Sequence, residues 1–134
     1  MLKQRNINGG TMSDSKSAMI KALDQWFEAY NNKDVDGVLS YHTEDSSLFA
    51  PNAPRVDGVE GIRGTIQGML DSGINVLSHE VTEADCREDL GYLLAKGTLD
   101  IPATGKVNAK IIDILKRQSD GSWKFYATSW NLDS

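Results

Sequence analysis

The sequence predicts an α+β fold in which N-terminal helices pack on one face of a mainly antiparallel sheet. Three observations lead to this class. Helical periodicity dominates the first half of the chain, four long strand-like segments fill the second half, and a hairpin turn joins the last two. Helices followed by an antiparallel meander are typical of α+β proteins. At 134 residues the chain has the length of one domain and can bury a hydrophobic core.

The first two helices are predicted from capping residues and from the spacing of apolar side chains. Serine and aspartate side chains from Ser13 onward offer N-caps, and apolar residues then recur at helical spacing from Met19 to Tyr30. Asp34 caps a second, short helix. That helix is expected to stop near His42, where a histidine cation would suit the helix dipole.

A third helix is predicted over residues 58–72, and it carries a stripe of three glycines. These are Gly61, Gly64 and Gly68. Because glycine lowers helix stability, the stripe predicts either close backbone packing or a mobile helix.

The strands are predicted from the change in period after residue 45. A short strand over 46–50 ends at Pro51, since proline cannot donate to a strand ladder. Four longer strands are expected at about 74–85, 90–101, 106–117 and 122–132. The dipeptide Asp120-Gly121 separates the last two strands and favours a hairpin turn, because glycine tolerates positive φ angles.

Composition restricts the partners and the location of the protein. Residues 1–12 are expected to form a flexible, polar arm before a domain over 13–134. The arm lacks the apolar segment of a secretory signal, and no apolar run is long enough to span a membrane, so we expect a soluble, cytoplasmic protein. The net charge is −5 and the basic residues are dispersed, which argues against a nucleic-acid partner. Two distant histidines without metal-ligand spacing predict no metal, and no cofactor is expected.

Four segments in sequence order resemble the signatures of one known family. An aromatic-rich helix runs into an Asp-x-Asp-Gly turn over 26–38, an acidic segment follows over 42–46, a Gly-x-Glu-x-Ile helix start lies at 58–62, and a terminal hairpin spans 120–133. Together they resemble SnoaL-like and ketosteroid-isomerase-like domains of the nuclear transport factor 2-like superfamily. The resemblance implies a cone-shaped, cystatin-like fold whose curved sheet wraps a long helix and encloses an apolar pocket for a small molecule. Many relatives dimerise through the outer sheet face.

The resemblance also implies where catalytic groups would lie. The ketosteroid isomerases place their base before a proline at the end of the first strand, where this chain has Ala50 and therefore no proton to move. Their oxyanion-binding tyrosine corresponds to Trp26, which offers a weaker N–H donor. Their protonated aspartate corresponds to Asp113. Strand alternation places Asp113 on the face of Ile111 and Leu115, where burial would raise the pKa of the carboxyl.

Asp113 has a second interpretation, in which it pairs with a cation on the outer face of the sheet. The available partners are Lys96, Lys110 and Arg117. His79, in the middle of a strand, is the other candidate catalytic residue and would act as a general base. A lone strand histidine beside Glu80 also fits a structural or exposed position.

The resemblance implies that Trp26, Tyr30, Phe49, Asp113 and Trp130 line the pocket, although each aromatic residue also suits plain core packing. Two classes of function remain open. One is an isomerase- or cyclase-like enzyme that uses Asp113 with His79 or a water. The other is a non-catalytic module that binds an apolar ligand or supports dimerisation or a larger assembly. Because Ala50 supplies no base for ketosteroid-type chemistry, it favours this second class over a ketosteroid isomerase. The resemblance also implies a third possibility, in which the concave face receives a peptide or a helix.

A homodimer is expected because the last strands carry apolar residues on both faces, of which the cone covers only one. These residues are Val107, Ile112, Ile114, Phe125 and Tyr126.

Overall fold

Residues 12–133 are described by the computed structural model of the chain. Its elements in chain order are α1 (Met12–Asn31), α2 (Val35–Leu39), β1 (His42–Phe49), β2 (Val56–Asp57), α3 (Val59–Asp71), β3 (Asn75–Arg87), β4 (Leu90–Ile101), β5 (Gly105–Arg117) and β6 (Trp123–Leu132). Residues 1–11 of the predicted arm lie outside the described residues. No helix among the described residues is long and apolar enough to cross a membrane.

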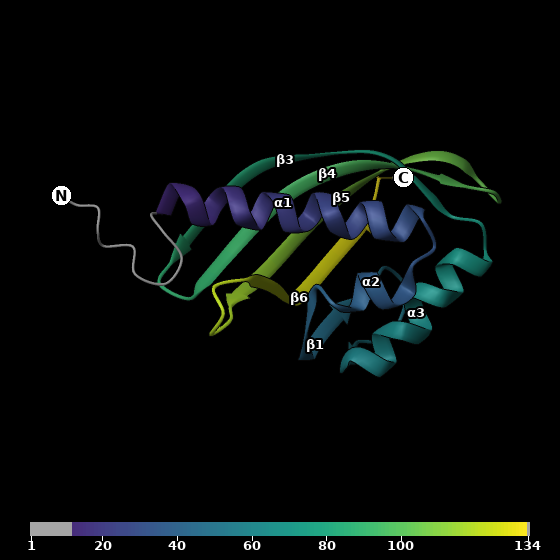
Figure 1. Cartoon of the computed structure of the whole chain (residues 1–134). Coiled ribbons are helices and arrows are strands. Elements are labelled where there is room, and N and C mark those ends of the chain that lie inside the picture. The colour runs from purple at the N-terminus through teal and green to yellow at the C-terminus, as the bar shows by residue number, and fades with distance from the viewer. Residues whose placement is uncertain (1–11, 134) are drawn as a thin grey trace.

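The strands form one curved six-stranded sheet in the order β2-β1-β6-β5-β4-β3. All neighbouring strands are antiparallel except β1 and β6, which pair in parallel. Figure 1 shows α1 lying across the concave face of this sheet, with α2 and α3 at the end next to β1. The predicted α+β class with a mainly antiparallel sheet is confirmed. The two-residue strand β2 was not predicted, because it is too short to carry a sequence pattern.

Helix α1 presents one apolar face to the sheet. Met19, Leu23, Phe27 and Tyr30 follow each other at helical spacing, and all four are buried. Polar contacts fix the C-terminal end of the helix to β3. The Tyr30 hydroxyl donates to the carbonyl of Ile74 at 2.8 Å.

The Asn31 side chain, one residue further along, makes two hydrogen bonds with Val76 on β3. It accepts from the backbone N–H of Val76 at 3.2 Å and donates to its carbonyl at 2.9 Å. This side chain therefore fills one gap in the hydrogen bonding of an edge strand, and α1 is held in a fixed position over the concave face.

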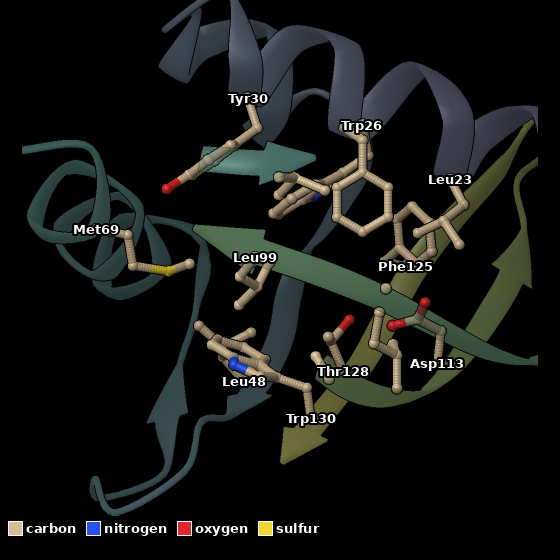
Figure 2. A pocket seen from close by; sticks show the side chains of 15 residues that line it. Leu23, Trp26, Tyr30, Leu48, Met69, Leu99, Asp113, Phe125, Thr128 and Trp130 are labelled. Carbon is tan, nitrogen blue, oxygen red and sulfur yellow. The ribbon is translucent and has the colours of Figure 1, made fainter. Parts of the chain in front are cut away.

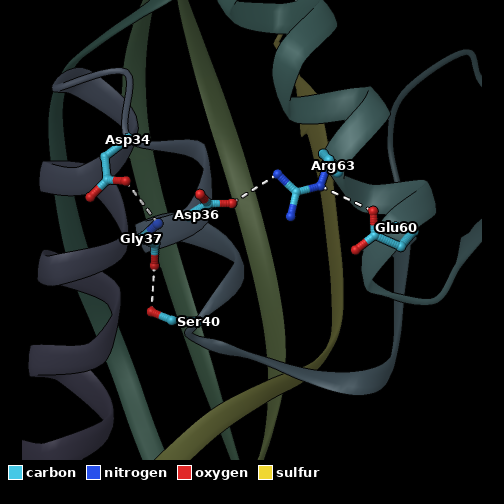
Figure 3. Close-up of polar contacts among 6 residues, drawn as sticks. All are labelled: Asp34, Asp36, Gly37, Ser40, Glu60 and Arg63. Carbon is cyan, nitrogen blue, oxygen red and sulfur yellow. Dashed lines mark hydrogen bonds and ion pairs between the residues drawn. The ribbon is translucent and has the colours of Figure 1, made fainter.

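Polar contacts also connect the two short helices, as Figure 3 shows. Asp34 caps α2 by accepting the backbone N–H of Gly37 at 2.9 Å, as predicted. Arg63 on α3 pairs with Asp36 on α2 at 2.9 Å and with Glu60 on its own helix at 3.1 Å. Because these groups are largely exposed, solvent screens their attraction and they contribute little to stability.

Burial of Ile62 and Ile66 is what attaches α3 to the core. Its glycine stripe is not a packing surface, which contradicts one of the two sequence-based interpretations. A Cβ atom added at Gly64 or Gly68 would meet no atom within 4 Å. Only Gly61 is crowded, since a Cβ atom added there would lie 2.7 Å from Cγ1 of Val56.

Candidate functional site

An apolar cavity of about 60 Å³ lies between α1 and the concave face of the sheet. Figure 2 shows Leu23, Trp26 and Tyr30 reaching it from α1, Met69 from α3 and Trp130 from β6. The described residues that line it include no lysine, arginine or histidine. Apart from a tyrosine hydroxyl, a single carboxyl is their one ionisable group. The cavity is therefore an apolar space with a single acidic function.

That carboxyl belongs to Asp113, in the middle of β5. Asp113 is only 1% exposed, and its cross-strand partners are Leu93 on β4 and Thr128 on β6. It shares the inward face with Ile111 and Leu115, as strand alternation predicted. Asp113 therefore points into the cavity rather than toward the outer face of the sheet.

The cations considered as outer-face partners of Asp113 bind other acids. Lys96 lies 3.6 Å from Glu80, Lys110 lies 2.9 Å from Asp133, and Arg117 lies 2.6 Å from Asp89. The second interpretation of Asp113, an ion pair on the outer face, is wrong.

The Asp113 carboxyl is both desolvated and incompletely hydrogen-bonded. Desolvation by burial raises its pKa from 3.8 to about 7, and hydrogen bonding to the Thr128 side chain offsets a part of that increase. Within the described residues, the Oδ2 atom has no hydrogen-bond partner. A carboxyl with this pKa holds a proton about half the time at neutral pH, so it can donate a hydrogen bond or exchange a proton.

Trp26 lines the cavity with its ring, but its N–H group is already engaged. The indole Nε1–H donates to Nε2 of His42 at 2.9 Å. The ring stacks on Tyr30 with centroids 5.7 Å apart and 3° between the planes. Because an indole has only this one donor, Trp26 cannot also bind an oxyanion in the cavity, which corrects the role that the resemblance implied.

His42 is the residue that sequence reasoning misjudged most. It does not end a helix as a cation but begins β1, and it is 4% exposed. Desolvation lowers its pKa from 6.5 to about 4, so it is neutral at physiological pH. The Nδ1 atom lies 3.1 Å from Oγ of the buried Ser46.

A local irregularity of β1 makes the contact between His42 and Ser46 possible. Residues four apart in a regular strand are separated by about 13 Å. Here the five steps from His42 to Ser47 lie opposite only two steps of β6, from Phe125 to Ala127. This bulge folds the start of β1 back on itself and brings both side chains into the core.

Phe49, predicted to line the pocket, does not. It is 38% exposed, and the guanidinium of Arg55 lies over its ring at 5.1 Å. The preceding residue, Leu48, is buried and lines the cavity instead. The prediction was wrong by one position, because a one-residue error in strand parity reverses the face of every side chain.

His79 also lies outside the cavity lining. Its Nε2 atom is 2.6 Å from Oδ1 of Asp24 on α1, and its ring packs on Phe27 with centroids 4.5 Å apart. The structure therefore does not bring His79 together with Asp113. Ala50, at the position of the ketosteroid-isomerase base, is likewise absent from the cavity lining.

Three solved structures share this fold over most of their length. A ketosteroid isomerase-like protein from Erwinia carotovora atroseptica superposes with a TM-score of 0.79 at 19% identity, covering 90% of this chain and 97% of that one. A cystatin-like protein of unknown function from Nostoc punctiforme gives 0.77 at 17% identity, covering 92% and 93%. A nuclear transport factor 2-like protein of unknown function from Pseudomonas putida gives 0.75 at 13% identity, covering 89% and 87%.

At these identities the structural likeness establishes the fold alone. None of the curated proteins matches the chain. The sequence model of the SnoaL-like domain matches residues 23–126, which include the C-terminal part of α1, most of the sheet and Asp113. The chain therefore belongs to the SnoaL-like domain family, as the resemblance in its sequence predicted.

Proposed function

We propose that this SnoaL-like domain binds a small, mostly apolar molecule in the cavity and that the protonated Asp113 donates a hydrogen bond to an oxygen of that ligand. The observation that carries this proposal is the unpaired Oδ2 atom of Asp113 in an apolar cavity. Leaving a buried polar group unsatisfied costs about 1–3 kcal/mol. A ligand with a carbonyl or hydroxyl oxygen recovers this energy when it pairs with the carboxyl.

The size and charge of the cavity restrict the ligand further. An engineered cavity of about 150 Å³ in another protein admits benzene, whereas this one measures about 60 Å³. A ligand of a few non-hydrogen atoms fits, and a larger one requires the walls to move. Because no cationic side chain lines the cavity within the described residues, a carboxylate ligand finds no partner and is disfavoured.

An enzymatic form of this function is proton transfer by Asp113 during an isomerisation or cyclisation. A pKa of about 7 suits a group that both accepts and returns a proton near neutral pH. Ketosteroid isomerisation is not supported, since Ala50 has no ionisable group and the Trp26 N–H is engaged by His42. Binding without chemistry requires only the cavity and Asp113.

Cyclopentanone, a neutral ketone of about the size of benzene whose binding requires the cavity walls to move outward, tests the proposal by NMR titration at pH 6 and pH 8. We expect binding at pH 6, because Asp113 is then mostly protonated. Above pH 7 the affinity should decrease, approaching about a tenfold loss for each pH unit. Asp113→Asn keeps an N–H donor at every pH and should make the affinity independent of pH. Asp113→Leu should abolish the preference for the ketone over cyclopentane. No binding at pH 6, or unchanged binding in Asp113→Leu, contradicts the proposal.

We also propose that the protein is a homodimer through the outer face of the sheet. The supporting observation is the exposure of Ile112 (54%) and Ile114 (38%), which pair across the strands with Leu94 and Tyr92. Exposed apolar side chains in adjacent strands form the kind of patch that a partner covers. Phe125, one of the apolar residues that the last strands carry on their two faces, is buried and does not belong to this patch.

A further inference from the structure

We propose that His42 is a positioning residue: as the neutral Nδ1–H tautomer it accepts the Trp26 indole N–H and holds that ring as a wall of the cavity. His42 touches no ligand in this arrangement, since it does not line the cavity. The inference rests on the proposed function in one respect, because a fixed wall matters only if the cavity takes a ligand. The tautomer and the hydrogen bond are testable without any ligand.

The chemistry of the two rings fixes the direction of the hydrogen bonds. An indole nitrogen is a donor only, so the 2.9 Å contact from Nε1 of Trp26 requires Nε2 of His42 to be the acceptor. A neutral imidazole whose Nε2 accepts must carry its proton on Nδ1. That proton is then donated to Oγ of Ser46, 3.1 Å away. Both ring nitrogens of His42 are therefore satisfied only in this tautomer.

Packing supports the hydrogen bond in holding the Trp26 ring. The ring stacks on Tyr30 and meets Phe27 edge-on at 5.2 Å, and both neighbours are buried. These contacts restrict the tilt of the indole, while the hydrogen bond to His42 fixes its rotation about the side-chain bonds. His42 is itself confined by the Phe125 ring, 5.8 Å away between centroids. A fixed ring is a wall that needs no ordering when a ligand arrives.

The hydrogen bond also determines which polar group a ligand meets. With its N–H directed at His42, Trp26 presents only its aromatic surface to the cavity. The Tyr30 hydroxyl donates its proton to the carbonyl of Ile74. The donors of the lining that remain are the carboxyl of Asp113 on β5 and the indole N–H of Trp130 on β6, since the Thr128 hydroxyl is hydrogen-bonded to Asp113. A ligand oxygen is therefore directed to the β5–β6 side, and His42 contributes to orientation through Trp26.

The first experiment uses the wild-type protein without ligand. Nitrogen-15 NMR at pH 7 should show His42 with a protonated Nδ1 and an unprotonated Nε2. The indole N–H of Trp26 should move upfield in His42→Phe, which removes the acceptor, and stay near its wild-type position in His42→Gln, whose side-chain oxygen replaces Nε2. A proton on Nε2 in the wild type overturns the proposal, whether or not either variant folds.

The second experiment measures cyclopentanone affinity at pH 6 in the same variants. We expect His42→Phe to bind about fivefold more weakly, because the released Trp26 ring must be ordered when the ligand binds, and His42→Gln to recover most of that loss. Equal weakening in two folded variants overturns the positioning role. If the wild type does not bind the ketone at all, the proposed function fails, while the NMR result still decides whether His42 holds Trp26.

Discussion

Asp113 and Thr128 are cross-strand partners on β5 and β6, and both side chains line the same apolar cavity. Hydrogen bonding to Thr128 lowers the pKa of the carboxyl, and desolvation raises it by more. Replacing Thr128 by valine preserves the shape of the side chain and removes the hydroxyl. We therefore expect the Asp113 pKa to rise further in Thr128→Val, as measured by a carbon-13 NMR titration of the carboxyl. Thr98→Val, which removes a hydroxyl that bonds to Asn108 instead, is the matched control, and an unchanged or lowered Asp113 pKa in Thr128→Val contradicts the assignment.

The second prediction concerns the pH dependence of stability in Asp113→Asn. The folded pKa of Asp113, about 7, lies above the ordinary value of 3.8. The unfolded chain therefore loses this proton first, and the free energy of unfolding of the wild type declines as pH rises from about 4 to about 7. Asparagine does not ionise, so its stability relative to wild type should increase over that range, by about 4 kcal/mol at most.

Urea denaturation at pH 4.5 and pH 8 measures this difference. Asp45→Asn, the same substitution at an exposed position, serves as the control and should follow the wild-type curve. If the relative stability of Asp113→Asn does not change with pH, the carboxyl is not held in its acid form by burial.

His42 should produce the opposite pH dependence. Its folded pKa, about 4, lies below the ordinary 6.5, so the unfolded chain takes up a proton first as pH falls. Stability contributed by the neutral histidine is complete above pH 6.5 and declines between about 6.5 and 4, by about 3 kcal/mol. In the wild type this slope opposes that of Asp113, so it should emerge clearly in the Asp113→Asn background. Adding His42→Gln to that background should flatten the curve, and a curve that stays steep excludes His42 as its source.

The elements with a regular repeat of apolar residues were predicted well, because side chains at the helical or strand period lie on the same face and are buried together. The face of α1 that begins at Met19 is buried as expected, and β4 has the predicted bounds, Leu90–Ile101. Asp113 was placed on the correct face because Ile111 and Leu115 alternate with it over an uninterrupted strand. Periodicity needs no knowledge of the partner strand, so these features are accessible from sequence alone.

The features that sequence reasoning missed depend on long-range register. The bulge in β1 exists only in relation to β6, far away in the chain, and without it the side chains of His42 and Ser46 would not meet. Phe49 was placed on the wrong face for a related reason, since the short first strand offered too few residues to fix its parity. Thr128 gave no signal of its own, because its importance comes from lying opposite Asp113.

The fourth prediction is that α3 can be stabilised without touching the cavity. Gly64 and Gly68 are exposed, and each has open space where the Cβ atom of an alanine would lie. Since glycine is about 1 kcal/mol less favourable than alanine in a helix, Gly64→Ala and Gly68→Ala should each raise the free energy of unfolding by up to that amount. Gly61→Ala is the contrasting variant and should gain less or lose stability, because its Cβ atom would lie only 2.7 Å from the Val56 side chain. Equal gains at all three positions in urea denaturation would show that crowding at Gly61 is absent.

The last prediction tests the dimer. Ile112 and Ile114 are adjacent outward positions of β5, and their exposure in a single chain leaves apolar surface that water solvates poorly. We expect light scattering at micromolar concentration to give the mass of two chains for the wild type and of one chain for the Ile112→Glu/Ile114→Glu double variant. Leu77→Glu is a matched control, because Leu77 is also exposed, at 49%, but lies on the edge strand β3. It should remain dimeric.

The double variant should still fold, since the substituted side chains face outward rather than into the core, and its thermal transition distinguishes loss of the interface from loss of the fold. A wild-type protein with the mass of one chain, or a double variant that stays dimeric, excludes this face as the interface.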